Sequence, residues 1–126
     1  YPLCKGSVMS VAARKQGDDV LVFAGGKDKK LTVFKFDGKL NKLWEVEVDA
    51  APRSLDLFND QILMGLKNGS LVVMPYTADG KGKPDVVMTS HCDGEVWGLE
   101  VVTLPDGSIK LMTSADDNRI LCYDVK

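Results

Sequence analysis

Apolar residues in this chain come in short runs separated by turn residues. No stretch of ten or more residues shows the i, i+3, i+4, i+7 spacing of an amphipathic helix. The runs are rich in β-branched and aromatic residues, which favour strands. The pattern therefore predicts an all-β fold, with strands at residues 7–12, 20–24, 31–36, 43–48, 53–58, 62–66, 71–76, 86–89, 95–103, 109–114 and 119–125.

Glycine, asparagine and aspartate supply the turns between these strands. Asn68-Gly69 is the strongest hairpin signal in the chain, because both residue types tolerate a positive φ. Residues 43–48 alternate apolar and acidic side chains, which predicts one buried face and one wet face. We expect this strand to form the outer edge of a sheet.

The strand pattern repeats along the chain. The strands that open at Leu31, Leu71 and Ile120 each follow a tight turn and come third in their set, at separations of 40 and 49 residues. Propeller blades recur at about 40–50 residues, whereas a β-sandwich has no recurring four-strand set. We expect a fragment of a WD-repeat β-propeller, with two full four-stranded blades at 8–48 and 53–89 and an incomplete blade at 95–126.

Such a fragment leaves blade faces to be covered. Closed propellers have typically about four to eight blades, and stacked repeats without neighbours expose apolar faces and an open strand edge. The chain starts at Tyr1 without a methionine or a visible leader, which fits a piece of a longer protein. We expect the remaining blades, or failing these a second copy, to cover the exposed faces.

Composition indicates an ordinary globular protein and argues against a membrane-spanning, disulfide-rich or zinc-binding protein. The chain is 44% hydrophobic and 27% charged, and no apolar run approaches the roughly 20 residues of a membrane helix. Its three cysteines, Cys4, Cys92 and Cys122, include no close pair, which argues against a disulfide framework or a zinc site and fits a reducing cytoplasm.

One candidate site is the polar set His91, Thr113, Asp117 and Tyr123 in the third blade. In WD-repeat blades a histidine, a serine or threonine, an aspartate and a tryptophan form a buried hydrogen-bonded tetrad, and Tyr123 stands at the tryptophan position. The other blades offer Asp28 with Phe34 and Asn68 with Met74, which cannot complete the set. We expect His91 and Asp117 to hold a turn; the alternative is a catalytic pair.

Enzymatic chemistry finds no support in the motifs. The chain has no Gly-x-Ser-x-Gly elbow, no phosphate-binding loop and no calcium-loop spacing, so we expect no enzyme activity and no cofactor. Trp97 lies in an apolar run beside Gly98, where we expect close packing rather than ligand stacking.

Two motifs resemble the echinoderm microtubule-associated protein-like (EMAP-like) family. His91-Cys92-Asp93-Gly94-Glu95-Val96-Trp97-Gly98-Leu99 is similar to that family's His-x-Asp-Glu/Gly-Glu-x-Trp-Gly-Leu string, and Phe23-Ala24-Gly25-Gly26-Lys27-Asp28-Lys29-Lys30-Leu31 to its Gly-Gly-Lys-Asp-Arg/Lys-Lys turn. The resemblance spans nearly the whole chain. It departs at Cys4-Lys5, where a blade-opening histidine would stand, and at Tyr123.

The resemblance implies a non-enzymatic cytoskeletal scaffold. Members of the family carry tandem propellers and associate with tubulin or microtubules. From this resemblance we expect this chain in the cytoplasm and its cytoskeleton, including the cilium or flagellum.

The charge distribution fits an acidic protein partner. Residues 1–42 hold nine lysines and arginines against four acids, although the chain's net charge is −2. Such a basic segment attracts an acidic surface such as that of tubulin. We expect a partner-binding basic patch made of Lys27, Lys29, Lys30, Lys39 and Lys42; otherwise these lysines would serve only to solubilise the turns. The alternative is a general adaptor that binds another protein or peptide; we expect neither a nucleic acid nor a membrane as partner.

Overall fold

The fold consists of three antiparallel sheets of four, four and three strands. It was established from a computed structural model that describes residues 6–80, 82–89, 91 and 94–125. The first sheet contains β1 (Val8–Gln16), β2 (Asp19–Gly26), β3 (Lys30–Phe36) and β4 (Leu40–Glu47). The second contains β5 (Pro52–Phe58), β6 (Gln61–Leu66), β7 (Ser70–Pro75) and β8 (Asp85–Thr89). The third contains β9 (Val96–Thr103), β10 (Ile109–Ala115) and β11 (Ile120–Val125).

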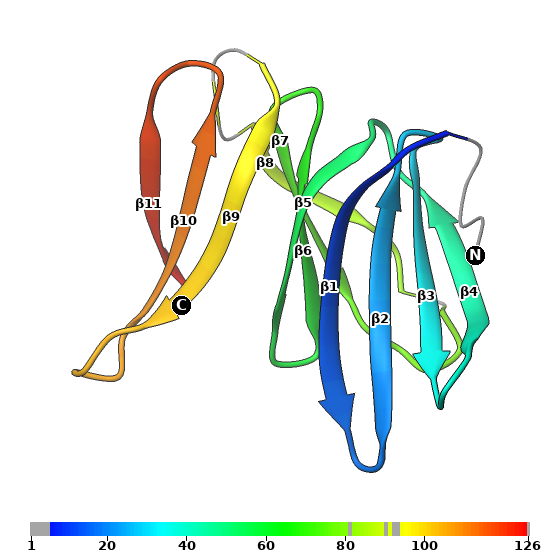
Figure 1. Cartoon of the computed structure of the whole chain (residues 1–126). Helices are drawn as coiled ribbons and strands as arrows, with labels where there is room; N and C mark the ends of the chain where they lie inside the picture. Colours follow the sequence, from blue (N-terminus) through cyan, green and yellow to red (C-terminus); the bar gives the residue numbers. More distant parts are fainter. Residues whose placement is uncertain (1–5, 81, 90, 92–93, 126) are drawn as a thin grey trace.

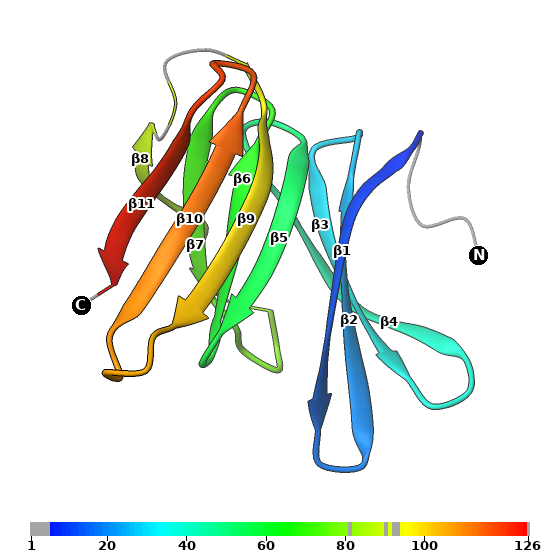
Figure 2. The same ribbon diagram turned by 60° about the vertical axis from the view of Figure 1, so that its left-hand side comes forward.

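The sheets stand next to one another as blades do in a propeller (Figure 1). Within each sheet the strands follow chain order, and the first strands β1, β5 and β9 are neighbours across the sheets. Figure 2 shows the same arrangement from another side, with β5 between β1 and β9. The all-β propeller fold predicted from the sequence is confirmed, with two four-stranded blades and a three-stranded third blade.

All three blades begin with the same irregularity. The register shifts between Val8 and Ser10 in β1, between Pro52 and Ser54 in β5, and opposite Val96 in β9. The bulge therefore recurs every 44 residues (Val8, Pro52, Val96). A β-bulge bends its strand and increases the local twist, so each first strand turns in the same way beside its neighbour.

A serine and a glycine join each blade to the next. The Ser10 hydroxyl donates to the carbonyl oxygen of Pro52 at 3.0 Å, and the Ser54 hydroxyl donates to that of Val96 at 2.9 Å. Each serine pairs with a glycine on the second strand, Gly25 or Gly65. A Cβ on Gly65 would lie 2.5 Å from Val96 Cγ1, so only glycine lets β9 approach this closely.

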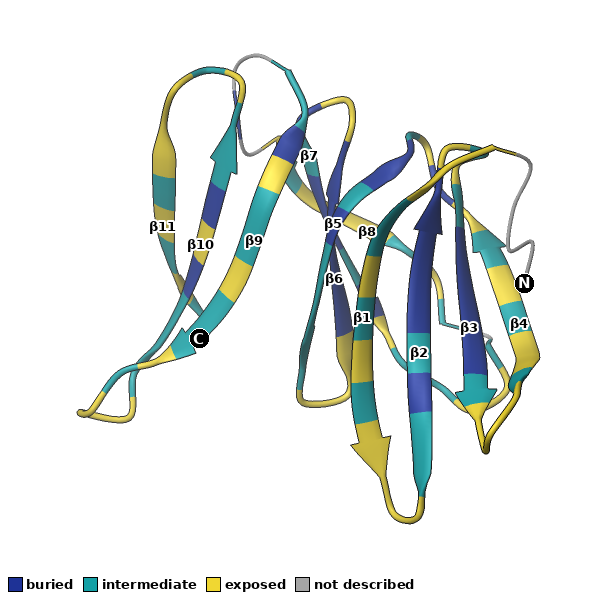
Figure 3. Ribbon diagram, viewed as in Figure 1, coloured by how far each residue is buried: buried dark blue, intermediate teal, exposed yellow. Residues whose placement is uncertain are grey.

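The core lies between the sheets (Figure 3). One cluster between the first two blades is built around Phe23, Leu31 and Met64, all fully buried. A smaller cluster between the second and third blades contains Leu63, Leu71 and Leu111. Burial of apolar side chains from adjacent sheets is the main stabilising contribution in this stacked fold.

On the outer face of the third blade, the position that is buried in the first two blades has no neighbouring sheet packed against it. The β10–β11 turn matches the β2–β3 and β6–β7 turns, so Ile120 corresponds to Leu31 and Leu71. Leu31 and Leu71 are 0% and 1% exposed, whereas Ile120 is 76% exposed. The Ser–Gly pair is inverted here, with Gly98 on β9 and Ser114 on β10.

Three details differ from the sequence-based expectation. β4 begins at Leu40, three residues before the strand expected at 43–48, because Leu40 already pairs with Phe36 in β3. β1 extends to Gln16 because the turn at Gly17-Asp18 lets it pair with β2 along its whole length. In the β6–β7 hairpin only Gly69 has a positive φ (82°), while the Asn68 side chain accepts a hydrogen bond from Ser70 N at 3.2 Å. No helix in the described part of the chain is long and apolar enough to span a membrane.

Candidate functional site

A buried polar chain links the third blade's turn to its strands. His91 precedes β9, and its Nδ1 lies 2.9 Å from Asp117 Oδ1. Its Nε2 lies 2.9 Å from Thr113 Oγ1 in β10. Both imidazole nitrogens are thus engaged, and the His91 side chain is fully buried.

Tyr123 in β11 extends the chain through a hydrogen bond with Thr113, and burial raises the pKa of its phenol above the usual range. The structure therefore brings together the four predicted residues His91, Thr113, Asp117 and Tyr123. The corresponding position holds Phe34 in the first blade and Met74 in the second, both buried.

The geometry of this tetrad suits a structural role better than catalysis. The His91 ring has no surface open to a substrate, and Asp117 also accepts the backbone N–H of Arg119 at 3.1 Å within the turn. Cys4, Lys5, Cys92 and Asp93, which the sequence motifs also include, lie outside the described residues. Among the residues described, Cys122 is an exposed free thiol, and no cluster of His, Cys, Asp or Glu could hold a metal ion.

The structure does not bring the five predicted lysines into one patch. Lys27 and Lys29 lie in the β2–β3 turn, whereas Lys39 lies in the β3–β4 hairpin at the opposite end of β3. Lys30 and Lys42 both bind the Glu45 carboxylate on the exposed face of the sheet. Hydrogen bonds from these two lysines lower the pKa of Glu45 to about 2. One of their two positive charges is therefore neutralised locally.

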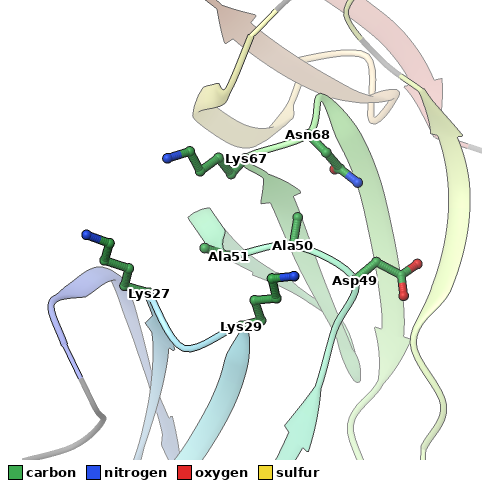
Figure 4. Close-up of a pocket in the computed structure, with 7 residues that line it drawn as sticks. All are labelled: Lys27, Lys29, Asp49, Ala50, Ala51, Lys67 and Asn68. Carbon is green, nitrogen blue, oxygen red and sulfur yellow. The ribbon is translucent and has the colours of Figure 1, made fainter.

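Lys27 and Lys29 instead belong to a pocket on the upper loop face, the end of the sheets that carries the β2–β3, β4–β5, β6–β7 and β10–β11 connections. The pocket has a volume of about 460 Å³ and is lined by Lys27, Lys29, Asp49, Ala50, Ala51, Lys67 and Asn68 (Figure 4). The ammonium groups of Lys27 and Lys29 form no ion pair with other described residues. The Asp49 side chain points away from them (Figure 4).

Lys67 is a member of this lysine pocket that the sequence reasoning missed. It lies 40 residues after Lys27 and occupies the same position in the β6–β7 turn as Lys27 does in the β2–β3 turn. Aligning the turns of the two blades would have found it. Lys67 Nζ also lies 3.4 Å from Glu95 Oε1, but its side chain remains 57% exposed.

The expected close packing of Trp97 is wrong. Its side chain is half-exposed at the junction of the second and third blades, and the Arg53 guanidinium stacks 3.6 Å from the ring centroid. The indole N–H donates to Asp116 Oδ1 at 2.6 Å. A Cβ on Gly98 would lie 2.4 Å from Ser114 Oγ, so this glycine makes room for a serine of the same sheet and not for the indole.

Comparison with known proteins identifies a WD-repeat relative, although no family model matches the chain. The chain is 36% identical over 109 residues to the ciliary WD repeat-containing protein ctxp80 of Euplotoides octocarinatus. The match covers 86% of this chain and 14% of the relative, so the chain spans a small part of that protein's length.

Solved structures show the same fold. BBS1N, crystallised in complex with ARL6DN, matches 97% of this chain and 38% of its own with a TM-score of 0.69 and 18% identity. Sqt1 of Saccharomyces cerevisiae matches 95% of this chain and 31% of its own with a TM-score of 0.72 and 15% identity. The sequence match and the shared fold together make this chain a homologue of a WD-repeat protein, with the blades of a β-propeller.

Proposed function

We propose that this chain is part of a non-enzymatic, EMAP-like scaffold that binds tubulin or microtubules through the lysine pocket of its upper loop face. The pocket carries the proposal, because Lys27, Lys29 and Lys67 line it from adjacent blades while only Asp49 supplies a negative charge among its lining residues. Lysines on neighbouring turns attract an acidic surface within about 8–10 Å, the Debye length at moderate ionic strength.

The relative supports a cytoskeletal setting. A ciliary WD-repeat protein is 36% identical to this chain, which favours the cilium or flagellum and its microtubules within the cytoplasm. Rigid strands hold the pocket's turns, which suits a surface that must present fixed charges to a partner. The proposal requires no cofactor, nucleic acid or membrane.

Microtubule co-sedimentation tests the proposal. Replacing Lys27, Lys29 and Lys67 with glutamate should weaken binding by about tenfold or more at low salt, because it reverses three charges of the pocket. The matched control replaces Lys15, Lys39 and Lys83, all exposed and at the opposite end of the strands, with the same net change in charge. Equal binding by the two variants, or pelleting that does not respond to salt, would exclude this pocket.

The second candidate is a general adaptor that grips another protein without a cytoskeletal role. BBS1N, which shares this fold, was crystallised in complex with ARL6DN, so a propeller of this kind does hold a protein partner. A pull-down that retains one defined protein but no tubulin, and loses it in the Lys27/Lys29/Lys67 variant, would favour the adaptor.

A further inference from the structure

The upper loop face carries an aromatic platform beside the lysine pocket. Trp97 is half-exposed, yet its ring is fixed by the Arg53 guanidinium on one face and by the hydrogen bond from its indole N–H to Asp116. Asp116 also accepts the backbone N–H of Glu95 at 2.9 Å, which anchors the carboxylate. An exposed tryptophan held this firmly loses little conformational entropy when a ligand covers it.

A continuous set of contacts joins the platform to the pocket. Lys67, which lines the pocket, lies 3.4 Å from Glu95, and Glu95 forms an ion pair with Arg53. Arg53 in turn stacks on Trp97. One ligand can therefore touch both features without leaving the loop face.

The charges along this path change sign. Lys27, Lys29 and Lys67 surround the pocket, whereas Asp116 lies directly against the Trp97 indole and the Arg53 charge on the ring is already paired with Glu95. Hydrogen bonds from Glu95 N and the indole lower the pKa of Asp116, so this carboxyl stays ionised at neutral pH. A second acidic group would be repelled beside Trp97, while an apolar side chain would gain contact with the ring.

We propose that the upper loop face binds an extended peptide that places acidic residues in the lysine pocket and an apolar or aromatic residue on Trp97. Aromatic pairs and tryptophan anchors dominate the energetics of many interfaces, so the apolar residue would set specificity while the lysines set salt dependence. This inference rests on the proposed function and names the kind of partner segment that the pocket selects.

Two synthetic peptides test it: an oligoglutamate, and the same peptide with one central glutamate replaced by phenylalanine. The protein should bind the phenylalanine peptide more tightly. Trp97→Ala should weaken that binding about tenfold and leave oligoglutamate binding within about twofold. Equal affinity of the two peptides, with no effect of Trp97→Ala, would overturn the inference but leave the acidic-partner proposal standing.

A second readout does not depend on how the Trp97→Ala variant folds. The chain has two tryptophans, and Trp44→Phe leaves Trp97 as the only indole. Acrylamide quenching of Trp97 fluorescence should fall when the phenylalanine peptide binds and change little with oligoglutamate. Unchanged quenching with bound phenylalanine peptide would overturn the inference. If neither peptide binds the unaltered protein, both the inference and the acidic-partner proposal fail.

Discussion

Thr113 lies at the centre of the buried tetrad. Its hydroxyl contacts His91 Nε2 at 2.9 Å on one side and the Tyr123 hydroxyl on the other, and the residue is 2% exposed. Removing a buried hydroxyl leaves its partners buried without hydrogen bonds. The resulting loss of stability exceeds the net contribution of the hydrogen bond itself. We infer that the tetrad fixes the β10–β11 turn against the strands.

Thr113→Val should therefore lower the free energy of unfolding by about 1–3 kcal/mol. Thr103→Val is the matched control, since it makes the same chemical change at an exposed position of β9. Urea unfolding followed by circular dichroism measures both. If the two variants lost equal stability, the tetrad would not be the reason for the loss.

Glu45 gives a pH prediction at the same scale. Its pKa is lowered to about 2 from the usual 4.5 by hydrogen bonds from Lys30 and Lys42. A depressed carboxyl pKa contributes stability that is complete above the unfolded value and is lost as the pH falls toward the folded value. NMR titration of the Glu45 carboxyl should give a midpoint well below 4. A midpoint near 4.5 would mean that Lys30 and Lys42 do not stabilise the ionised Glu45 carboxylate.

The Ser–Gly pair explains how one blade is aligned on the next. Ser54 bonds the backbone of β9, and Gly65 beside it leaves room for Val96. Asp56 adds a further bond, accepting the backbone N–H of Val101 at 2.7 Å. Each contact is between a side chain of one blade and the first strand of the next, so stacking is set by direct bonding as well as by apolar burial.

Gly65→Ala should destabilise the chain by about 1–3 kcal/mol, because its Cβ would lie 2.5 Å from Val96 Cγ1 and force β9 away. Gly98→Ala is the control. Its Cβ would come closest to the Ser114 hydroxyl, which can rotate aside. Thermal unfolding compares the two variants. A loss at Gly98→Ala as large as at Gly65→Ala would contradict the role given to the glycine in blade contact.

The elements of this fold are largely predictable from the sequence. Alternating runs and turn residues place all of the strands to within a few residues, because strand periodicity and turn chemistry are local properties. The length of β1 was the exception, since the residues up to Gln16 are strand only through their pairing with β2. The tetrad residues are also predictable, because WD-repeat blades carry a histidine, a serine or threonine, an aspartate and an aromatic residue at these positions and the third blade has all four.

The surfaces of the whole molecule are not predictable in the same way. Lys27 and Lys39 are close in sequence, but β3 carries them to opposite ends of the blade. Lys67 and Trp97 come near the pocket only because three blades stack in order. Linear charge counting cannot report such convergence, which depends on the long-range arrangement of the sheets.

The distribution of lysines between the two ends of the blades predicts which end of the propeller meets its partner. Lysines on the upper loop face should be covered, and those at the opposite hairpins should stay in solvent. The alternative adaptor hypothesis uses the same face, so the position of the contact and the identity of the partner are separate questions.

Lysine acetylation of the microtubule-bound protein, read by mass spectrometry, tests the central claim most directly. Binding should protect Lys27, Lys29 and Lys67 by about tenfold relative to the free protein while Lys15, Lys39 and Lys83 react as before. Protection of Lys15, Lys39 and Lys83 with full reactivity at the pocket, or equal reactivity of both sets in bound and free protein, would contradict the account.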